Sequence, residues 1–253
     1  MATATKHQNM PVRVAVYVVG ALLLALGVVL NTKSNLGIST TNSVPNVLNV
    51  VVHQHDPNTW MTLGWACNII YVIDICFQCI VYRQVRVKVL LQLPFSVLFG
   101  RVVDFYVGLF VGAGVLDATT KALAVPSMGT QVVFLVLGIV FTAVGIAMVV
   151  NMDFVPNPPD GGVQALTALT KWPFGRAKIL WDGILLVITC VVSLVFTTDH
   201  TIVGIGIGTV LAFFAIGNII SWVNKQFGDA FKAVYDKDAV AAEKAAEKAG
   251  ATA

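Results

Sequence analysis

The chain has 253 residues, of which 57% are apolar and only 11% are charged. Its mean hydropathy is +0.82. Because soluble domains carry roughly 25% charged residues, this composition excludes an ordinary water-soluble domain and indicates an integral membrane protein. The formal net charge of +3 follows from the placement of Lys and Arg around membrane spans, so it gives no reason to expect a nucleic-acid partner.

Six apolar stretches are each long enough to cross a bilayer as a helix, for which about 20 residues suffice. The first has full span length and lacks a clear cleavage site, so we expect it to be retained as a helix. The sequence therefore predicts an all-α membrane protein with six transmembrane helices in one bundle. The stretches cover approximately residues 12–31, 60–81, 89–112, 131–151, 178–197 and 202–222.

Lys and Arg are distributed unevenly between the loops that join these stretches. If the N-terminus is in the cytoplasm, Lys33 and Lys121 are the only Lys or Arg residues in the outer segments. Arg101 lies within a span, and all the remaining Lys and Arg residues, including Lys178, belong to the inner segments. Because positively charged loops remain on the cytoplasmic side, we expect a multi-pass protein of the bacterial inner (plasma) membrane with both termini in the cytoplasm.

One pattern occurs at the start of each half of the chain, at residues 20–42 and 138–160. Both copies open with Gly-x6-Gly and end at a polar residue, which is Asn42 in the first copy and Asp160 in the second. Each half holds three predicted spans, and an odd number of spans turns the second half over relative to the first. Two inverted three-span repeats are typical of a transporter with a central site.

A stretch rich in Asn, Ser, Thr and Pro interrupts each half after its first span, and a short apolar piece follows it. At 1.5 Å per residue such a piece is too short to cross a bilayer, so we expect a broken or re-entrant helix capped by Asn42 or Asp160. The positive N-terminal ends of both helices would then face a common centre. The interruptions and short pieces cover approximately residues 31–42, 43–52, 151–159 and 161–169.

Neither half is predicted to be a separate domain. The terminal segment rich in Ala, Lys and Glu is expected to be a cytoplasmic helix or a frayed end, and we assign it no chemistry. The predicted organisation is a cytoplasmic N-terminus at 1–11, a first membrane repeat at 12–112, an outer loop at 113–130, a second membrane repeat at 131–225 and a cytoplasmic tail at 226–253.

Several short motifs connect the chain with a known family. They are the Gly-x6-Gly opening of each half, Pro-Pro-Asp-Gly at 158–161, Phe-Gly-Arg at 174–176 and the glycine-rich run 203–209 that leads into Gly217. With these motifs the chain resembles the YczE/YitT-like group of bacterial membrane proteins, loosely in the first half and well in the second. The resemblance extends from residue 12 to about residue 225. It implies a multi-span inner-membrane protein, and it does not name a substrate.

The first interruption departs from the pattern of this group. It carries Thr41 and Asn42 where the resemblance leads us to expect Pro-x-Asp. If that aspartate acts in both halves of the relatives, the resemblance implies that Asp160 alone supplies it in this chain.

Two charged residues lie inside the third predicted span, where ionisable groups cost several kcal/mol unless they are paired or hydrated. Arg101 and Asp104 share a helix face. They are interpreted either as a self-neutralising pair that fixes helix packing, or as a site where Arg101 binds a carboxylate or phosphate while Asp104 holds its side chain. Gly100 and Gly217 occupy equivalent positions in the two halves and are expected to allow close helix packing. The same alignment makes the polar residue Asn218 the equivalent of Arg101.

Asp160 is the strongest candidate for chemistry. It is either a structural helix cap or a carboxylate that faces the centre and binds a cation, an amine or a proton. Asp74, inside the second span, is the other candidate for coupling to an ion, whereas Asp182 is expected to be solvated at the interface. An anion would be repelled by Asp160 unless Arg101 or a proton compensates, and a zwitterion or a polar heterocycle avoids that conflict. The neutral groups expected around the site are Ser39, Thr40, Asn42 and Asn157.

Motifs for other chemistry are missing from the sequence. It has neither a Gly-x4-Gly-Lys-Ser/Thr loop for ATP nor a Gly-x-Ser-x-Gly elbow or His-rich zinc pattern. The four cysteines fall in predicted spans and are interpreted as small packing residues. We therefore predict a protein that is not an enzyme and that carries no cofactor or metal.

The sequence favours a secondary transporter that moves a small polar solute by alternating access coupled to H+ or Na+. Two alternatives remain open. One is a substrate-capturing membrane subunit that needs a separate energising partner, and the other is a nonenzymatic membrane scaffold. Beyond the lipid bilayer, the solute and the ion, the only further partner considered is a second copy of the chain in a homodimer.

Overall fold

The computed structural model describes residues 10–56, 60–61, 63–117 and 123–235. These residues form nine helices and no extended strand. The helices are α1 (Met10–Lys33), α2 (Thr40–His55), α3 (Leu63–Tyr82), α4 (Val87–Leu90), α5 (Gln92–Gly112), α6 (Met128–Asn151), α7 (Pro158–Thr170), α8 (Phe174–Phe196) and α9 (Ile207–Tyr235).

Within the described residues, six helical segments are long and apolar enough to cross a membrane, which confirms the prediction of six spans. They consist of α1, α3, α4 together with α5, α6, α8 and α9. The fifth begins at Phe174 rather than near residue 178, and the sixth continues to Tyr235. Residues 226–235 of the predicted tail are therefore part of α9, while residues 236–253 and 1–9 lie outside the described part of the chain.

The repeated glycine pattern forms one of the contacts between the two halves. A Cβ atom added at Gly138 would lie 2.6 Å from the backbone nitrogen of Asn31, and one added at Gly20 would lie 2.7 Å from the Cβ of Met148. Cβ atoms added at Gly27 and Gly145 would be similarly close to the backbone of the facing helix. Because the start of one helix faces the end of the other, α1 and α6 pack antiparallel, at a distance that only glycine permits.

The two short helices are α2 and α7, with 16 and 13 residues. At 1.5 Å per residue they are about 24 and about 20 Å long, less than the ~30 Å hydrocarbon core of a bilayer. They begin earlier than predicted, so Ser39 and Asn157 are the N-cap residues. The prediction that Asn42 and Asp160 cap them was wrong, because Pro158 suits the first helical position and the helix starts there.

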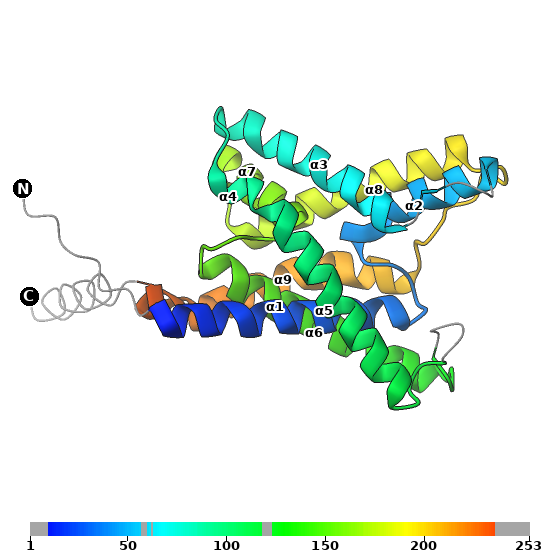
Figure 1. Ribbon diagram of the computed structural model, residues 1–253, viewed down its shortest axis with the longest axis horizontal. Helices are drawn as coiled ribbons and strands as arrows, with labels where there is room; N and C mark the ends of the chain where they lie inside the picture. The colour runs from blue at the N-terminus through cyan, green and yellow to red at the C-terminus, as the bar shows by residue number, and fades with distance from the viewer. Residues whose placement is uncertain (1–9, 57–59, 62, 118–122, 236–253) are drawn as a thin grey trace, which may run out of the picture.

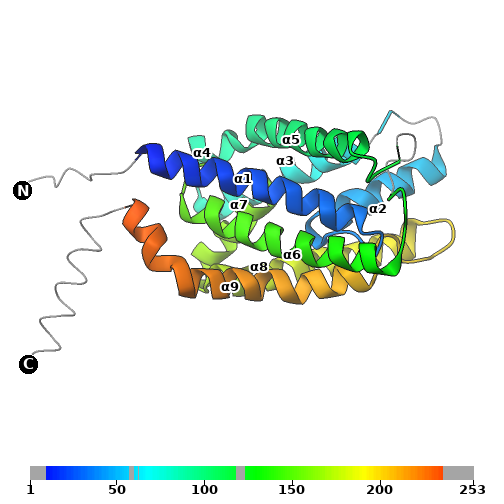
Figure 2. The same cartoon turned by 90° about the horizontal axis from the view of Figure 1, so that it is seen from below.

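The halves interlock around these short helices, since α2 packs against α8 and α7 packs against α3. Figure 1 shows α1, α6 and α9 along one side of the bundle and α2, α3 and α8 along the other, with α5 crossing obliquely. Figure 2 shows α1, α6 and α9 side by side, and in both views the start of α1 and the end of α9 lie at the same end of the bundle.

The two halves differ in how their last long helix is packed. In the second half, a Cβ atom added at Gly217 of α9 would lie 2.5 Å from Cγ1 of Ile179 in α8. In the first half, a Cβ atom at the corresponding Gly100 of α5 would meet no heavy atom within 4 Å among the described residues. The expectation of close packing is therefore right for Gly217 and wrong for Gly100, which instead borders an open cavity.

Candidate functional site

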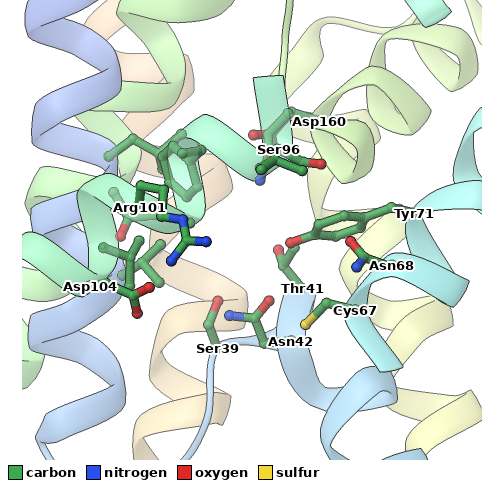
Figure 3. A pocket seen from close by; sticks show the side chains of 18 of the residues that line it. Ser39, Thr41, Asn42, Cys67, Asn68, Tyr71, Ser96, Arg101, Asp104 and Asp160 are labelled. Atoms are coloured by element: carbon green, nitrogen blue, oxygen red, sulfur yellow. The ribbon is translucent and has the colours of Figure 1, made fainter. Parts of the chain in front are cut away.

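A cavity of about 510 Å³ lies beside α5, within the roughly 300–1,000 Å³ typical of small-molecule sites. Helices α1, α3, α5 and α6 contribute to its wall, together with the first turns of α2 and α7 and the residues that precede them. Figure 3 shows polar side chains from these elements facing one another across it. The cavity thus lies where both interruptions of the sequence come together.

Most of the predicted site residues line this cavity. The structure brings together Asn42, Arg101, Asp104, Asn157 and Asp160 in its wall, from three separate segments of the chain. The expected neighbour Ser39 lies there as well.

Three members of the predicted set, Thr40, Asp74 and Asn218, are not among the residues that line the cavity. Asp74 is buried in α3. Thr40 is fully buried one residue before the lining residue Thr41. Asn218 is exposed on α9, where its Nδ2 donates a hydrogen bond to the carbonyl of Phe214 at 2.7 Å. Its correspondence with Arg101 in the sequence repeat therefore does not place it in the cavity wall.

Lys178 connects the two short helices. It was not among the site residues predicted from the sequence. Its side chain is 1% exposed. Its Nζ donates a hydrogen bond to Oγ1 of Thr41 at 3.0 Å and lies 3.7 Å from Oδ1 of Asp160. One buried cation thus contacts the first turn of α2 and the first turn of α7.

Asp182 is the closest partner of this lysine, with 2.9 Å between Nζ of Lys178 and Oδ1 of Asp182. The carboxylate is fully buried. The expectations that Asp182 is solvated and that Lys178 lies in a cytoplasmic loop were both wrong, because α8 already begins at Phe174 and carries both residues inward on one face. A Lys and an Asp four residues apart inside an apolar stretch were the available sequence signal.

The buried charges around Lys178 are unequal in number. The carboxylates of Asp74, Asp160 and Asp182 are each at most 4% exposed. An ionised Asp74 would be attracted by Lys178 and repelled by Asp160. Three carboxylates against one ammonium leave an excess of negative charge if all are ionised, and burying uncompensated charge is costly. The cluster is therefore a place where an added proton or another cation is stabilised.

Polar atoms without partners lie at the start of both short helices. In the described part of the chain, Oγ1 of Thr40 and Oδ1 of Asn157 are buried and have no hydrogen-bond partner. The side chain of Asn157 lies within interaction range of Tyr71, which also faces the cavity. Because buried polar atoms almost always have a partner, these atoms indicate a place for a ligand or for water.

The wall formed by α5 carries two charges of opposite sign. The guanidinium of Arg101 extends toward the middle of the cavity, and Asp104 lies one turn further along the same wall (Figure 3). No ion pair joins them to each other or to another charged group in the described residues. The self-neutralising pair and the interpretation in which Asp104 holds Arg101 both need an ion pair between these residues, so neither describes this structure.

A pair of buried glutamines holds the start of α7, and no pattern in the sequence predicted this pair. Nε2 of Gln78 donates to Oε1 of Gln92 at 2.9 Å, and Nε2 of Gln92 donates back to Oε1 of Gln78 at 2.7 Å. Gln78 also donates to the carbonyl of Pro158 at 3.2 Å. A Cβ atom at Gly161 would lie 2.5 Å from Nε2 of Gln92, so the glycine after Asp160 allows this close contact.

Six helical segments of membrane-spanning length and apolar character, in the described part of the chain, define an integral membrane protein. The chain belongs to DUF6198, a family of unknown function whose sequence model matches residues 11–225. No curated protein and no solved structure matches it. The resemblance to the YczE/YitT-like group stays a prediction.

Proposed function

We propose that this protein is a secondary transporter that moves a small polar solute across a bacterial inner membrane by ion-coupled alternating access. One observation carries the proposal: the first turns of α2 and α7 meet at the buried Lys178, next to a cavity of about 510 Å³. Short helices whose N-terminal ends converge on a central site are the arrangement that many transporters use to bind solutes.

The two halves are proposed to be inverted repeats that each contain one re-entrant helix. The antiparallel contact of α1 with α6 supports the inversion, and so does the reciprocal packing of α2 on α8 and α7 on α3. Because α2 and α7 are too short to cross the membrane, each would enter it and turn back. The common end at which α1 starts and α9 finishes (Figure 1) would be the cytoplasmic side.

Asp160 and Asp74 are the proposed coupling residues. Both are buried beside Lys178, in a cluster with more carboxylates than cations. A proton or Na+ that binds there reduces the negative charge and weakens the attraction between Lys178 and the first turn of α7. The occupancy of the ion site would thereby change how α7 is held against α8 and α2.

The proposed moving element is α5 relative to α3. In the second half α9 is tightly packed on α8 at Gly217, whereas α5 leaves open space at Gly100. Inverted repeats that exchange their two packing arrangements open a central site to opposite sides in turn. In the alternate state α5 would close on α3, and α9 would separate from α8.

Transport is tested with purified protein in liposomes that contain a pH-sensitive dye. L-amino acids, dicarboxylic acids, amines and nucleobases are added outside, with and without a proton or sodium gradient. We expect saturable, gradient-dependent uptake of one class, and Asp160→Asn should abolish its dependence on the gradient. Asp229→Asn, at an exposed position on α9, is the matched control and should leave uptake unchanged.

Two results would refute the proposed transport function. Tight binding of a solute without uptake would indicate a capture subunit that needs an energising partner. The absence of any saturable ligand, together with a harmless Asp160→Asn substitution, would indicate a scaffold.

A further inference from the structure

The cavity presents one positive and one negative side chain that have no charged partner. Arg101 and Asp104 lie three residues apart on α5, and both line the cavity. Residues at this spacing are neighbours on a helix surface, with about 5–6 Å between their Cβ atoms. They could approach each other, yet no ion pair joins them in the described structure. In a membrane such groups must face water or a ligand of opposite charge.

Another part of the wall offers hydrogen bonds to an anionic group. Ser39, Thr41 and Asn42 line the cavity at the first turn of α2, where the helix dipole favours negative charge. In addition, Oδ1 of Asn157, a residue that is 7% exposed and lines the cavity, has no hydrogen-bond partner among the described residues. That oxygen accepts hydrogen bonds, so it suits a ligand N–H group.

Part of the remaining wall is apolar. Leu24 and Val28 of α1, Phe99 of α5 and Ile146 of α6 line the same cavity. Apolar surface of this kind favours a ligand with a hydrocarbon portion, because burying that portion removes it from water.

We propose that the solute is a zwitterion of the amino-acid type, with an apolar body. Arg101 binds its carboxylate, Asp104 binds its ammonium group, and the apolar wall contacts its side chain. This assignment rests on the proposed function in one respect, namely that the cavity is the solute site.

Charge balance separates this ligand class from singly charged ones. An anion alone would compensate Arg101 but would be repelled by Asp104 and by Asp160, whose buried neighbourhood already carries excess negative charge. A cation alone would leave Arg101 unpaired. A zwitterion compensates both charges of α5 without changing the net charge of the cavity.

The test measures thermal unfolding of the full-length protein in detergent, with probes that differ only in charge. L-leucine and L-phenylalanine are the zwitterions, their N-acetyl derivatives the anions and their methyl esters the cations. We expect at least one amino acid to raise the Tm in a saturable manner, and its two derivatives to have no effect at the same concentration. Equal stabilisation by a derivative, or no stabilisation by either amino acid, overturns the proposal.

Substitutions then assign the two ends of the ligand. Arg101→Gln and Asp104→Asn should each raise the Kd of the stabilising amino acid about 10- to 100-fold, since each removes a charged hydrogen bond. Arg176→Gln and Asp199→Asn change exposed residues outside the cavity and should leave the Kd unchanged. Arg101→Lys keeps the charge and should recover part of the affinity, which distinguishes a lost contact from a misfolded variant. Unchanged affinity in Arg101→Gln overturns the proposal.

The proposal and the transport function fail separately. An amino acid that binds as described but is not taken up by liposomes refutes transport and leaves the ligand assignment intact. Uptake of a singly charged solute that is insensitive to Arg101→Gln refutes the ligand assignment and leaves transport intact.

Discussion

Replacing Lys178 with methionine removes the only cation that lies among three buried carboxylates in the described part of the chain. The side chain is 1% exposed, and its Nζ lies 2.9 Å from Asp182 and 3.7 Å from Asp160. Removing one partner of a buried ion pair costs about 3–5 kcal/mol, because the charge that remains has no compensation. For a protein of this size, 1 kcal/mol corresponds to about 2–4 °C, so we expect the Tm to fall by roughly 6–20 °C.

The assay is thermal unfolding in detergent, followed by intrinsic fluorescence. Lys225→Met is the matched control, since Lys225 is exposed on α9, and it should change the stability by no more than about 0.5 kcal/mol. Adding Asp182→Asn to Lys178→Met removes one uncompensated charge and should restore part of the lost Tm, which a double-mutant cycle measures as coupling. Equal Tm values for Lys178→Met and Lys225→Met would refute the electrostatic reasoning.

Three further predictions concern other parts of the bundle. Gly217→Ala should lower the Tm and Gly100→Ala should not, because only the methyl group added at Gly217 meets a neighbouring helix. Similar decreases in Tm for the two variants would contradict the difference in packing. Gln78→Leu should lower the stability by about 1–3 kcal/mol, because it leaves the buried amide of Gln92 unpartnered, and adding Gln92→Leu should cost less than a second equal loss; a chemical unfolding titration checks this. Asp74→Asn removes one of the excess buried carboxylates, so its Tm should be equal to or above that of the unmodified protein, and a fall as large as that of Lys178→Met would contradict the charge count.

The spans and the positions of the interruptions were predictable because they depend on local composition. Lipid contact requires long apolar stretches, and Pro, Asn and Ser interrupt helices wherever they cluster. The duplicated Gly-x6-Gly pattern marks the start of each half in the sequence, but its place in the contact between α1 and α6 is seen only in the structure. The predicted site residues Arg101, Asn157 and Asp160 do share one cavity.

The roles of individual buried polar residues were not predictable in the same way. Lys178 is assigned to an inner segment from the sequence because the predicted fifth span begins only near residue 178, whereas α8 begins at Phe174 and carries this lysine into the bundle. The pairing of Gln78 with Gln92 depends on how α3 and α5 meet, which no local pattern records. Such pairings arise from tertiary contacts, so a single sequence contains their residues without revealing their partners.

The glycine contact between α1 and α6 has a further property. A Cβ atom at Gly27 would meet the backbone of Thr142, and one at Gly145 would meet the backbone of Leu24. Leu24 and Thr142 occupy equivalent positions in the two copies of the pattern. The surface is thus self-complementary, as in an isologous homodimer, and a single half of the chain already contains both sides of it.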